Sequence, residues 1–241
     1  MKKLIAILLV FACMFAMASC AMGGTGGSQQ PATNTETQKV LDALTDLIRK
    51  SAPTKSEVTT VTGNADINLT STETVVMGEL SGKEAALYVY EYEKLGELGE
   101  ASAAKELVTE RQEYVEGYGV RVNGGKWEDV NSFVIKIIPY RINLDASLIQ
   151  SFTASEGNTA FTFVVPNKNL AQVLTGMDVS SITTDVAVTI ETDGSAVTHI
   201  GFKYDMRSIA LDANTQLDDA KVEIDAIYSY DLQSITLIDK K

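Results

Sequence analysis

Short runs rich in Val, Thr and Tyr, separated by turn residues, recur along most of this 241-residue chain. β-Branched and aromatic residues favour strands, and Gly, Asn and Asp between such runs favour tight turns. This succession predicts a large antiparallel sheet. The runs expected to form strands are residues 58–69, 74–80, 85–94, 107–117, 118–122, 133–138, 159–165, 183–191, 196–205, 222–230 and 235–238.

Turn signals between these runs predict hairpins. The clearest is Thr192-Asp193-Gly194-Ser195, which separates two alternating runs. Asn123-Gly124, Ser81-Gly82 and Gly63-Asn64 are similar signals. Gly and Asn adopt the positive φ that two-residue hairpin turns require, so adjacent runs are expected to pair in antiparallel fashion.

Helical periodicity is confined to a few segments. Val40, Leu41, Leu44, Leu47 and Ile48 recur at helical spacing, which predicts an amphipathic helix with one apolar stripe on the sheet. Residues 144–152 and 169–174 predict two further, central helices, and residues 102–113 fit either a helix or a strand. The resulting class is α+β, an antiparallel sheet with an N-terminal helix and two central helices on one face.

The N-terminus has the form of a secretory signal. Lys2 and Lys3 precede an apolar stretch of about 13 residues, which is shorter than the roughly 20 residues needed to span a bilayer. The stretch ends in Met17-Ala18-Ser19-Cys20, which resembles the lipobox of bacterial lipoproteins, with Met17 where Leu is usual. A plain signal peptide with an incidental cysteine is the alternative.

The lipobox resemblance implies removal of residues 1–19 and lipidation of Cys20 on its thiol and new amine. The protein would then be held to a membrane on its extracytoplasmic face. That face is the outer surface of a Gram-positive type of cell, or the periplasm or outer membrane where there are two membranes. Residues 20–37, rich in Gly, Ser, Thr and Gln, are expected to form a flexible tether to a single domain at residues 38–241.

Composition limits the partners and the sources of stability. Cys13 would be removed with the leader, which leaves no cysteine besides Cys20, so a hydrophobic core rather than disulfides must hold the domain together. Loss of Lys2 and Lys3 takes the formal net charge from −12 to −14. This charge argues against nucleic acid and against adhesion to anionic lipid by charge alone. A monomer is expected.

The lipobox, the N-terminal helix and the strand order together resemble small bacterial lipoproteins with a LolA/LppX-like fold. The turn at residues 122–127, which ends in Trp127, and the late hairpin at Asp193-Gly194 are similar to elements of that family. The resemblance covers residues 38–241. It implies a strongly curved, unclosed half-barrel whose concave face is covered by helices, with a lipid or acyl chain in the cavity between them. No family residue with a defined chemical role maps onto this chain.

Catalytic and metal-binding patterns are weak. His199 is the one histidine, and no G-x-S-x-G motif accompanies it, so a surface histidine on a strand is expected. Zinc-ligand spacings and phosphate-binding glycine motifs do not occur. Carboxylates are scattered, and a glycosidase pair would need two of them to converge. The sequence therefore predicts no enzyme activity and no cofactor. The two carboxylate clusters are Glu91, Glu93, Glu97 and Glu100, and Asp218-Asp219.

One acidic segment has the register of a calcium loop. Its residues occupy positions 1, 3, 5, 7 and 12, but Leu217 stands at position 6, where the sharp turn of such a loop requires Gly. A solvated loop is the preferred interpretation. The residues in the register are Asp212, Asn214, Gln216, Asp218 and Glu223.

Aromatic residues that alternate along strands are the candidate ligand contacts. Residues at i and i+2 of a strand share a face, and tyrosine suits a surface that is half apolar and half wet. The functional interpretation is the wall of a ligand groove, and the alternative is ordinary sheet packing with hydroxyls at the rim. The candidates are Tyr88, Tyr90, Tyr92, Trp127, Phe161, Phe163, Tyr228 and Tyr230.

Three functions remain open from the sequence. The leading hypothesis is a non-catalytic, membrane-anchored lipoprotein that binds or carries a lipid-like ligand in an apolar cavity. The alternative is a cell-envelope interaction lipoprotein with a filled core, which binds a protein or a wall polymer through its surface. An envelope hydrolase is the third and least supported. An empty apolar cavity favours the first hypothesis and a packed core favours the second.

Overall fold

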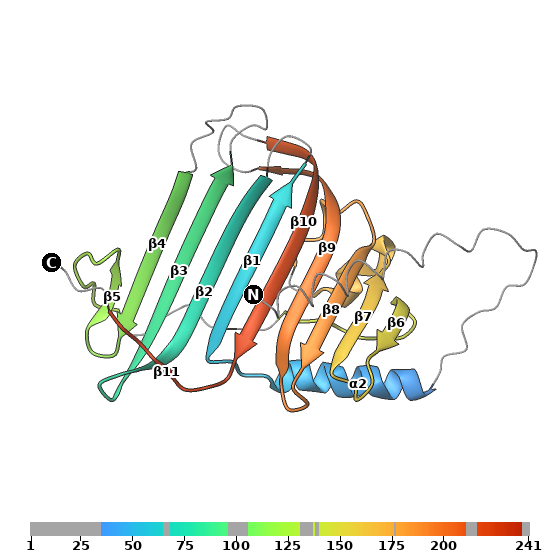
Figure 1. Ribbon diagram of the computed structural model, residues 1–241, viewed down its shortest axis with the longest axis horizontal. Coiled ribbons are helices and arrows are strands. Elements are labelled where there is room, and N and C mark those ends of the chain that lie inside the picture. Colours follow the sequence, from blue (N-terminus) through green and yellow to red (C-terminus); the bar gives the residue numbers. More distant parts are fainter. Residues whose placement is uncertain are drawn as a thin grey trace, which may run out of the picture. The chain divides into compact units, whose positions relative to one another are not determined.

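Strands β1 to β10 lie in one antiparallel sheet in the order β5-β4-β3-β2-β1-β10-β9-β8-β7-β6 (Figure 1). The two edge strands, β5 and β6, do not pair with each other, so the sheet is unclosed, as predicted. The strands are β1 Lys55–Gly63, β2 Asn68–Leu80, β3 Lys83–Leu95, β4 Glu106–Val115, β5 Gly119–Val122, β6 Gln150–Ala154, β7 Ala160–Val165, β8 Val186–Thr192, β9 Val197–Ala210, β10 Gln216–Ser229 and β11 Gln233–Ser234. The helices are α2 Thr35–Lys50, the 3₁₀ helix η2 Asn167–Asn169 and α3 Leu170–Val173.

The computed structural model describes residues 35–64, 68–95, 106–130, 137, 140–175, 177–210 and 216–237. The predicted leader and the lipidated Cys20 lie outside these residues. Residues 35–241 form one compact unit, as judged from the contacts between them. Across the described ranges, no helix is both long and apolar enough to cross a bilayer.

Two half-sheets meet where β1 pairs with β10. Lys55 lies opposite Ser229 and Gly63 opposite Lys221, so the pairing runs along the whole of β1. Strands β1 to β5 form one half and β6 to β10 the other. The short β11 is parallel to β2 and pairs with it at Gly78, beyond the point where β1 begins.

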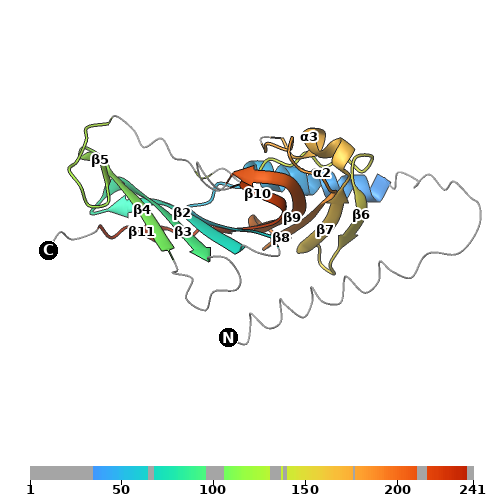
Figure 2. The ribbon, with the colours of Figure 1, turned by 90° about the horizontal axis from the view of Figure 1, so that it is seen from above.

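The two faces of the sheet differ in their cover. Side chains such as Val188, Phe202 and Ile224 point to what we call the inner face, where helix α2 and α3 lie (Figure 2). Residues of opposite parity, among them His199 and Asp225, point to the outer face. Most buried apolar residues belong to one core between the inner face of β7 to β10 and the helices.

Helix α2 confirms the predicted amphipathic helix. Leu41, Leu44 and Ile48 are buried in the main core. The helix begins at Thr35, inside the segment predicted to be the tether. Arg49 and Lys50 lie in its last turn, where positive charge interacts favourably with the negative end of the helix dipole.

The first predicted central helix, at residues 144–152, was wrong. The carboxylate of Asp145 accepts hydrogen bonds from the Ser147 amide and hydroxyl at 2.8 and 2.7 Å, and Leu148 N donates to Asp145 O. Such a local turn competes with helix formation. Strand β6 then begins at Gln150, with a register shift between Gln150 and Thr153. The second predicted helix, at residues 169–174, is confirmed as the short pair η2 and α3.

The predicted hairpins at Ser81-Gly82 and at Asp193-Gly194 are confirmed, whereas the turn at Asn123-Gly124 is followed, in the described residues up to 130, only by an isolated antiparallel bridge between Val120 and Glu128. Ser81 and Gly82 both have positive φ and join β2 to β3. Asp193 accepts hydrogen bonds from Ser195 N and Ala196 N at 2.8 Å, which closes the turn between β8 and β9. Asn123 has positive φ, and its side chain accepts a hydrogen bond from Arg111 N.

Other strand predictions differ in detail. The run at residues 58–69 is interrupted, because β1 ends at Gly63 and β2 begins at Asn68. The ambiguous run at residues 102–113 is strand β4 from Glu106 onward. The run at 133–138 lies outside the described residues except for Ile137, which has no regular structure.

A buried carboxylate organises the outer face of β4 and β5. Glu113 is fully buried, its Oε1 lies 3.0 Å from Arg111 Nε, and its Oε2 accepts a hydrogen bond from Arg121. Arg111 also donates to Thr236 O at 2.7 Å, and the Arg121 guanidinium lies 4.8 Å from the centre of the Trp127 ring. Glu113 thus links two strands to the C-terminal segment and to the Trp127 loop.

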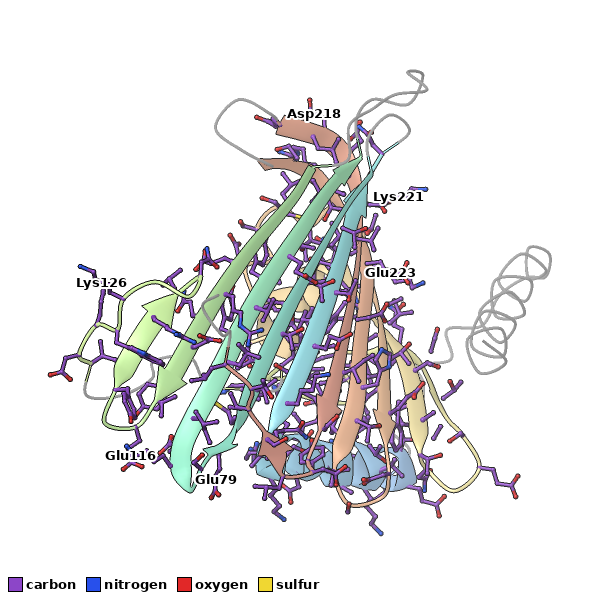
Figure 3. The ribbon with its side chains drawn as sticks, turned by 60° about the vertical axis from the view of Figure 1, so that its left-hand side comes forward. Glu79, Glu116, Lys126, Asp218, Lys221 and Glu223 are labelled. Carbon is purple, nitrogen blue, oxygen red and sulfur yellow. The ribbon has the colours of Figure 1, made fainter. Side chains whose placement is uncertain are left out.

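Removing this carboxylate should strongly destabilise the fold. We expect Glu113→Ala to lower the free energy of unfolding by about 3 kcal/mol, because it leaves two largely buried guanidinium groups without their acceptor. The matched control is the exposed Glu116→Ala (Figure 3), expected to change it by less than about 0.5 kcal/mol. Urea denaturation of both variants measures the difference, and equal effects would contradict a structural role for Glu113.

Candidate functional site

The space between the sheet and helix α2 is filled by the protein's own side chains. Leu41, Phe163 and Phe202 are each at most 2% exposed and belong to the same core cluster. Tyr140 packs edge-on against Phe202, with ring centres 4.9 Å apart. A ligand cavity of the kind implied by the family resemblance would occupy this layer, where these side chains lie instead.

A cavity lies at the C-terminal end of α2. This end pocket has a volume of about 660 Å³, within the usual range for small-molecule sites. Its lining includes three isoleucines, and the other lining residues are polar or basic. The lining residues are Thr45, Ile48, Arg49, Ser51, Ile137, Arg141, Ile142, Asn143 and Thr175.

Three segments far apart in the sequence build the end pocket. Helix α2 supplies Thr45, Ile48 and Arg49, whereas Ile142 and Asn143 follow Tyr140, which is anchored on Phe202. The amide of Asn143 donates to Val173 O at 2.8 Å, which fixes this segment to α3. The burial of Ile48 and Ile142 in the core therefore positions the polar groups around the pocket.

A smaller groove lies beside the middle of α2. Its volume is about 340 Å³, and Val40, Leu44, Leu47 and Phe161 contribute to its lining. Phe161 is the one predicted ligand contact that lines either of these two cavities. The groove is smaller and more apolar than the end pocket.

The predicted aromatic residues on β3, β7 and β10 share the inner face but do not converge. Tyr88 and Tyr228 lie in one row across β3, β2, β1 and β10, about 14 Å apart at ordinary strand spacing. Tyr90 and Phe161 share another row, about 29 Å apart. Phe163 is buried in the main core.

The remaining predicted contacts are divided among different places. Tyr230 donates a hydrogen bond to Val197 O at 2.6 Å. Tyr92 pairs with Ser71, and only its backbone position is described. Trp127 lies on the outer face, packed with Ala85 and Val115. Contact of these aromatic residues with a ligand stays a prediction.

Burial raises the pKa of several tyrosines on the inner side of the sheet. It raises the pKa of Tyr204 to about 12, with a smaller contribution from Tyr140. Burial, and then Glu73 and Glu110, raise the pKa of Tyr88. Burial and Glu73 likewise raise the pKa of Tyr140. These tyrosines act as neutral hydrogen-bonding groups near physiological pH.

The acidic segment with a calcium-loop register is largely a strand. Gln216, Asp218 and Glu223 lie on β10, and Figure 3 shows Asp218 near one end with Glu223 farther along. Glu223 pairs with Lys203 at 2.6 Å. Asp212 and Asn214 lie outside the described residues. Within the part of the chain that is described, no three His, Cys, Asp or Glu side chains are grouped to hold a metal ion.

The predicted surface histidine has specific partners on the outer face. His199 Nε2 donates to Asp225 Oδ1 at 3.1 Å, and its Nδ1 lies 4.0 Å from Glu191 Oε1. Gly201 leaves room for this ring, since a Cβ there would lie 3.3 Å from it. No hydroxyl is hydrogen-bonded to Nδ1, so this geometry joins three strands and does not form a catalytic triad.

Comparisons with known proteins give little guidance. No protein-family model and no curated protein matches the chain. Among solved structures, the chain is similar to a DUF1329 family protein from Desulfovibrio piger, at 12% identity and a TM-score of 0.28. That match covers 85% of this chain and 96% of the other. A TM-score this low supports no inference about fold or function.

The Asp225–His199 contact predicts a small pH-dependent contribution to stability. The hydrogen bond from His199 lowers the pKa of Asp225, so the contribution is present above the unfolded pKa of about 3.9 and is lost as pH falls through the lower, folded pKa. Asp225→Asn should cost ~0.2–1 kcal/mol at pH 7, because the Asp225 side chain is 48% exposed.

Urea unfolding at pH 7 and at pH 3 measures this difference, which should shrink at the lower pH. The control is Asp129→Asn, an exposed residue on a loop. If Asp225→Asn lowered the free energy of unfolding by the same amount at both pH values, the contribution would not be ionic. If Asp129→Asn lowered it equally, the contribution would not be specific to the Asp225–His199 contact.

Proposed function

We propose that the protein is a non-catalytic, extracytoplasmic lipoprotein, anchored to the membrane through Cys20, that binds a lipid-like ligand in the end pocket. The observation that carries the proposal is the pocket itself, of about 660 Å³, whose lining combines Ile48, Ile137 and Ile142 with polar and basic groups. An apolar lining with a few polar groups is typical of sites for amphiphilic small molecules.

A buried hydroxyl in the pocket supports this proposal. Thr45 Oγ1 is inaccessible to solvent and has no hydrogen-bond partner. An unsatisfied buried hydroxyl costs about 1–3 kcal/mol, and rotation of the Thr45 side chain toward a polar atom of a ligand in the pocket would recover part of that cost. Ordinary packing offers no such compensation.

A surface interaction module is the second candidate. The filled core favours it, because Phe163 and Phe202 occupy the layer where a carrier of the resembled family holds its ligand. The outer face of the sheet also bears no helix among the described elements (Figure 2). Ile227 on this face is 52% exposed. The two candidates differ in whether the end pocket holds a ligand.

The membrane anchor is tested by metabolic labelling of the full chain in a bacterial host. Labelled palmitate should be incorporated into the wild type and into Cys13→Ser, and lost in Cys20→Ser, because the lipid is expected on the Cys20 thiol. The two cysteines provide a matched pair. Label retained by Cys20→Ser, or lost equally in Cys13→Ser, would contradict the anchor.

The ligand is tested by native mass spectrometry and organic extraction of the full chain, released from membranes in a mild detergent. We expect a stoichiometric lipid-like molecule in the wild type and much less in Thr175→Trp, whose indole would obstruct the pocket. Thr183→Trp is the control, since both threonines are exposed and donate to a backbone carbonyl. A ligand-free mass that persists after incubation with envelope lipids would contradict the proposal and favour the second candidate.

A further inference from the structure

The charge of the end pocket is opposite to that of the chain. The chain has 32 acidic and 20 basic residues and a formal net charge of −12. The lining of the pocket nevertheless contains two arginines, Arg49 and Arg141, and no carboxylate. At physiological ionic strength salt screens exposed charges that are more than about 8 Å apart, so the local sign of charge matters more than the net charge.

The two arginines are not equally neutralised. Arg49 Nη1 lies 3.6 Å from Asp46 Oδ1 in the preceding turn of α2. Arg141 is exposed and forms no ion pair with any residue in the described ranges. Arg141 is therefore the stronger candidate for an anionic partner, because its guanidinium fork can bind two oxygen atoms at once.

Uncharged groups of the pocket lie near these arginines. Thr45 Oγ1 is buried and unpartnered, one helical turn before Arg49. The Asn143 side chain donates to Gln172 O at a long 3.4 Å, and the Thr175 hydroxyl donates to Arg141 O, also at 3.4 Å. These long hydrogen bonds leave both side chains able to donate to a better acceptor.

We propose that the ligand of the end pocket carries an acidic oxygen headgroup, a carboxylate or a phosphate. Arg141, assisted by Arg49, binds this headgroup, and the Thr45 hydroxyl, once its side chain rotates into the pocket, hydrogen-bonds to the ligand. Ile48, Ile137 and Ile142 contact its apolar part. This inference rests on the proposed function and names the chemical class of its ligand.

Isothermal titration of the lipidated full chain in phosphatidylcholine nanodiscs, corrected with empty nanodiscs, tests the inference. The probes are octyl phosphate, octanol and inorganic phosphate. Octyl phosphate represents the whole amphiphile, octanol its alkyl chain and inorganic phosphate its headgroup. The wild type should bind octyl phosphate more tightly than either of the other two. Arg141→Gln should weaken octyl phosphate ~10- to 100-fold and leave octanol unchanged, since it removes a charge-assisted hydrogen bond.

Two further variants locate the effect. Lys50→Gln removes a 78% exposed cation at the same helix end but outside the pocket, and should leave all three affinities unchanged. Thr45→Val should weaken octyl phosphate several-fold while leaving stability unchanged or raised, because it removes an unsatisfied buried hydroxyl. If the Thr45 hydroxyl had a purely structural role, Thr45→Val would instead lower the free energy of unfolding.

The outcomes distinguish this inference from the proposed function. If octanol binds as tightly as octyl phosphate and Arg141→Gln has no effect, the acidic headgroup is overturned and the lipid-like ligand stands. If inorganic phosphate binds as tightly as octyl phosphate and depends on Arg141, the anion site is supported and the lipid-like ligand is overturned. If no probe binds, both are overturned.

Discussion

The pairing of β1 with β10 is the constraint on which the rest of the sheet depends. It joins residues from opposite ends of the domain, with Lys55 opposite Ser229. Because side chains alternate along a strand, this one register decides which face each residue of both half-sheets occupies. Val58 and Ala226 thereby reach the inner face. Without the pairing, each half-sheet would expose a long unpaired edge, which is prone to aggregation.

Local signals in the sequence predicted most of the helices, strands and turns. They did not predict how segments distant in the sequence are arranged. Hairpin turns and helix α2 depend on neighbouring residues, so their patterns were sufficient. The apolar spacing at residues 144–152 placed Leu144 and Ile149 correctly in the core, but the Asp145 turn overrode the helix that the spacing predicted. Alternation correctly placed Tyr88 and Tyr90 on one face. Their distance from Phe161, however, depends on the order of the strands in the sheet, which no local pattern contains.

The end pocket could not be predicted from the sequence for the same reason. Thr45, Arg141 and Thr175 come from three separate segments, and each is unremarkable in its local pattern. Protein interiors are packed nearly as densely as organic crystals, so space is left only where elements meet imperfectly. Here the core under α2 is filled by Phe163 and Phe202, and the imperfect junction lies at the end of the helix.

The contrast between an acidic chain and a basic pocket bears on how such a protein would meet a membrane. At physiological ionic strength, charges farther apart than about 8 Å are largely screened, so Arg141 would act on a headgroup inside the pocket and not on a membrane surface. The net charge of −12 opposes adhesion to anionic lipid. If the proposed function is correct, the anchor would hold the domain near the membrane and the pocket would select the amphiphile that it binds. A domain that did not adhere to the bilayer could then bind a single amphiphile without competition from the surface as a whole.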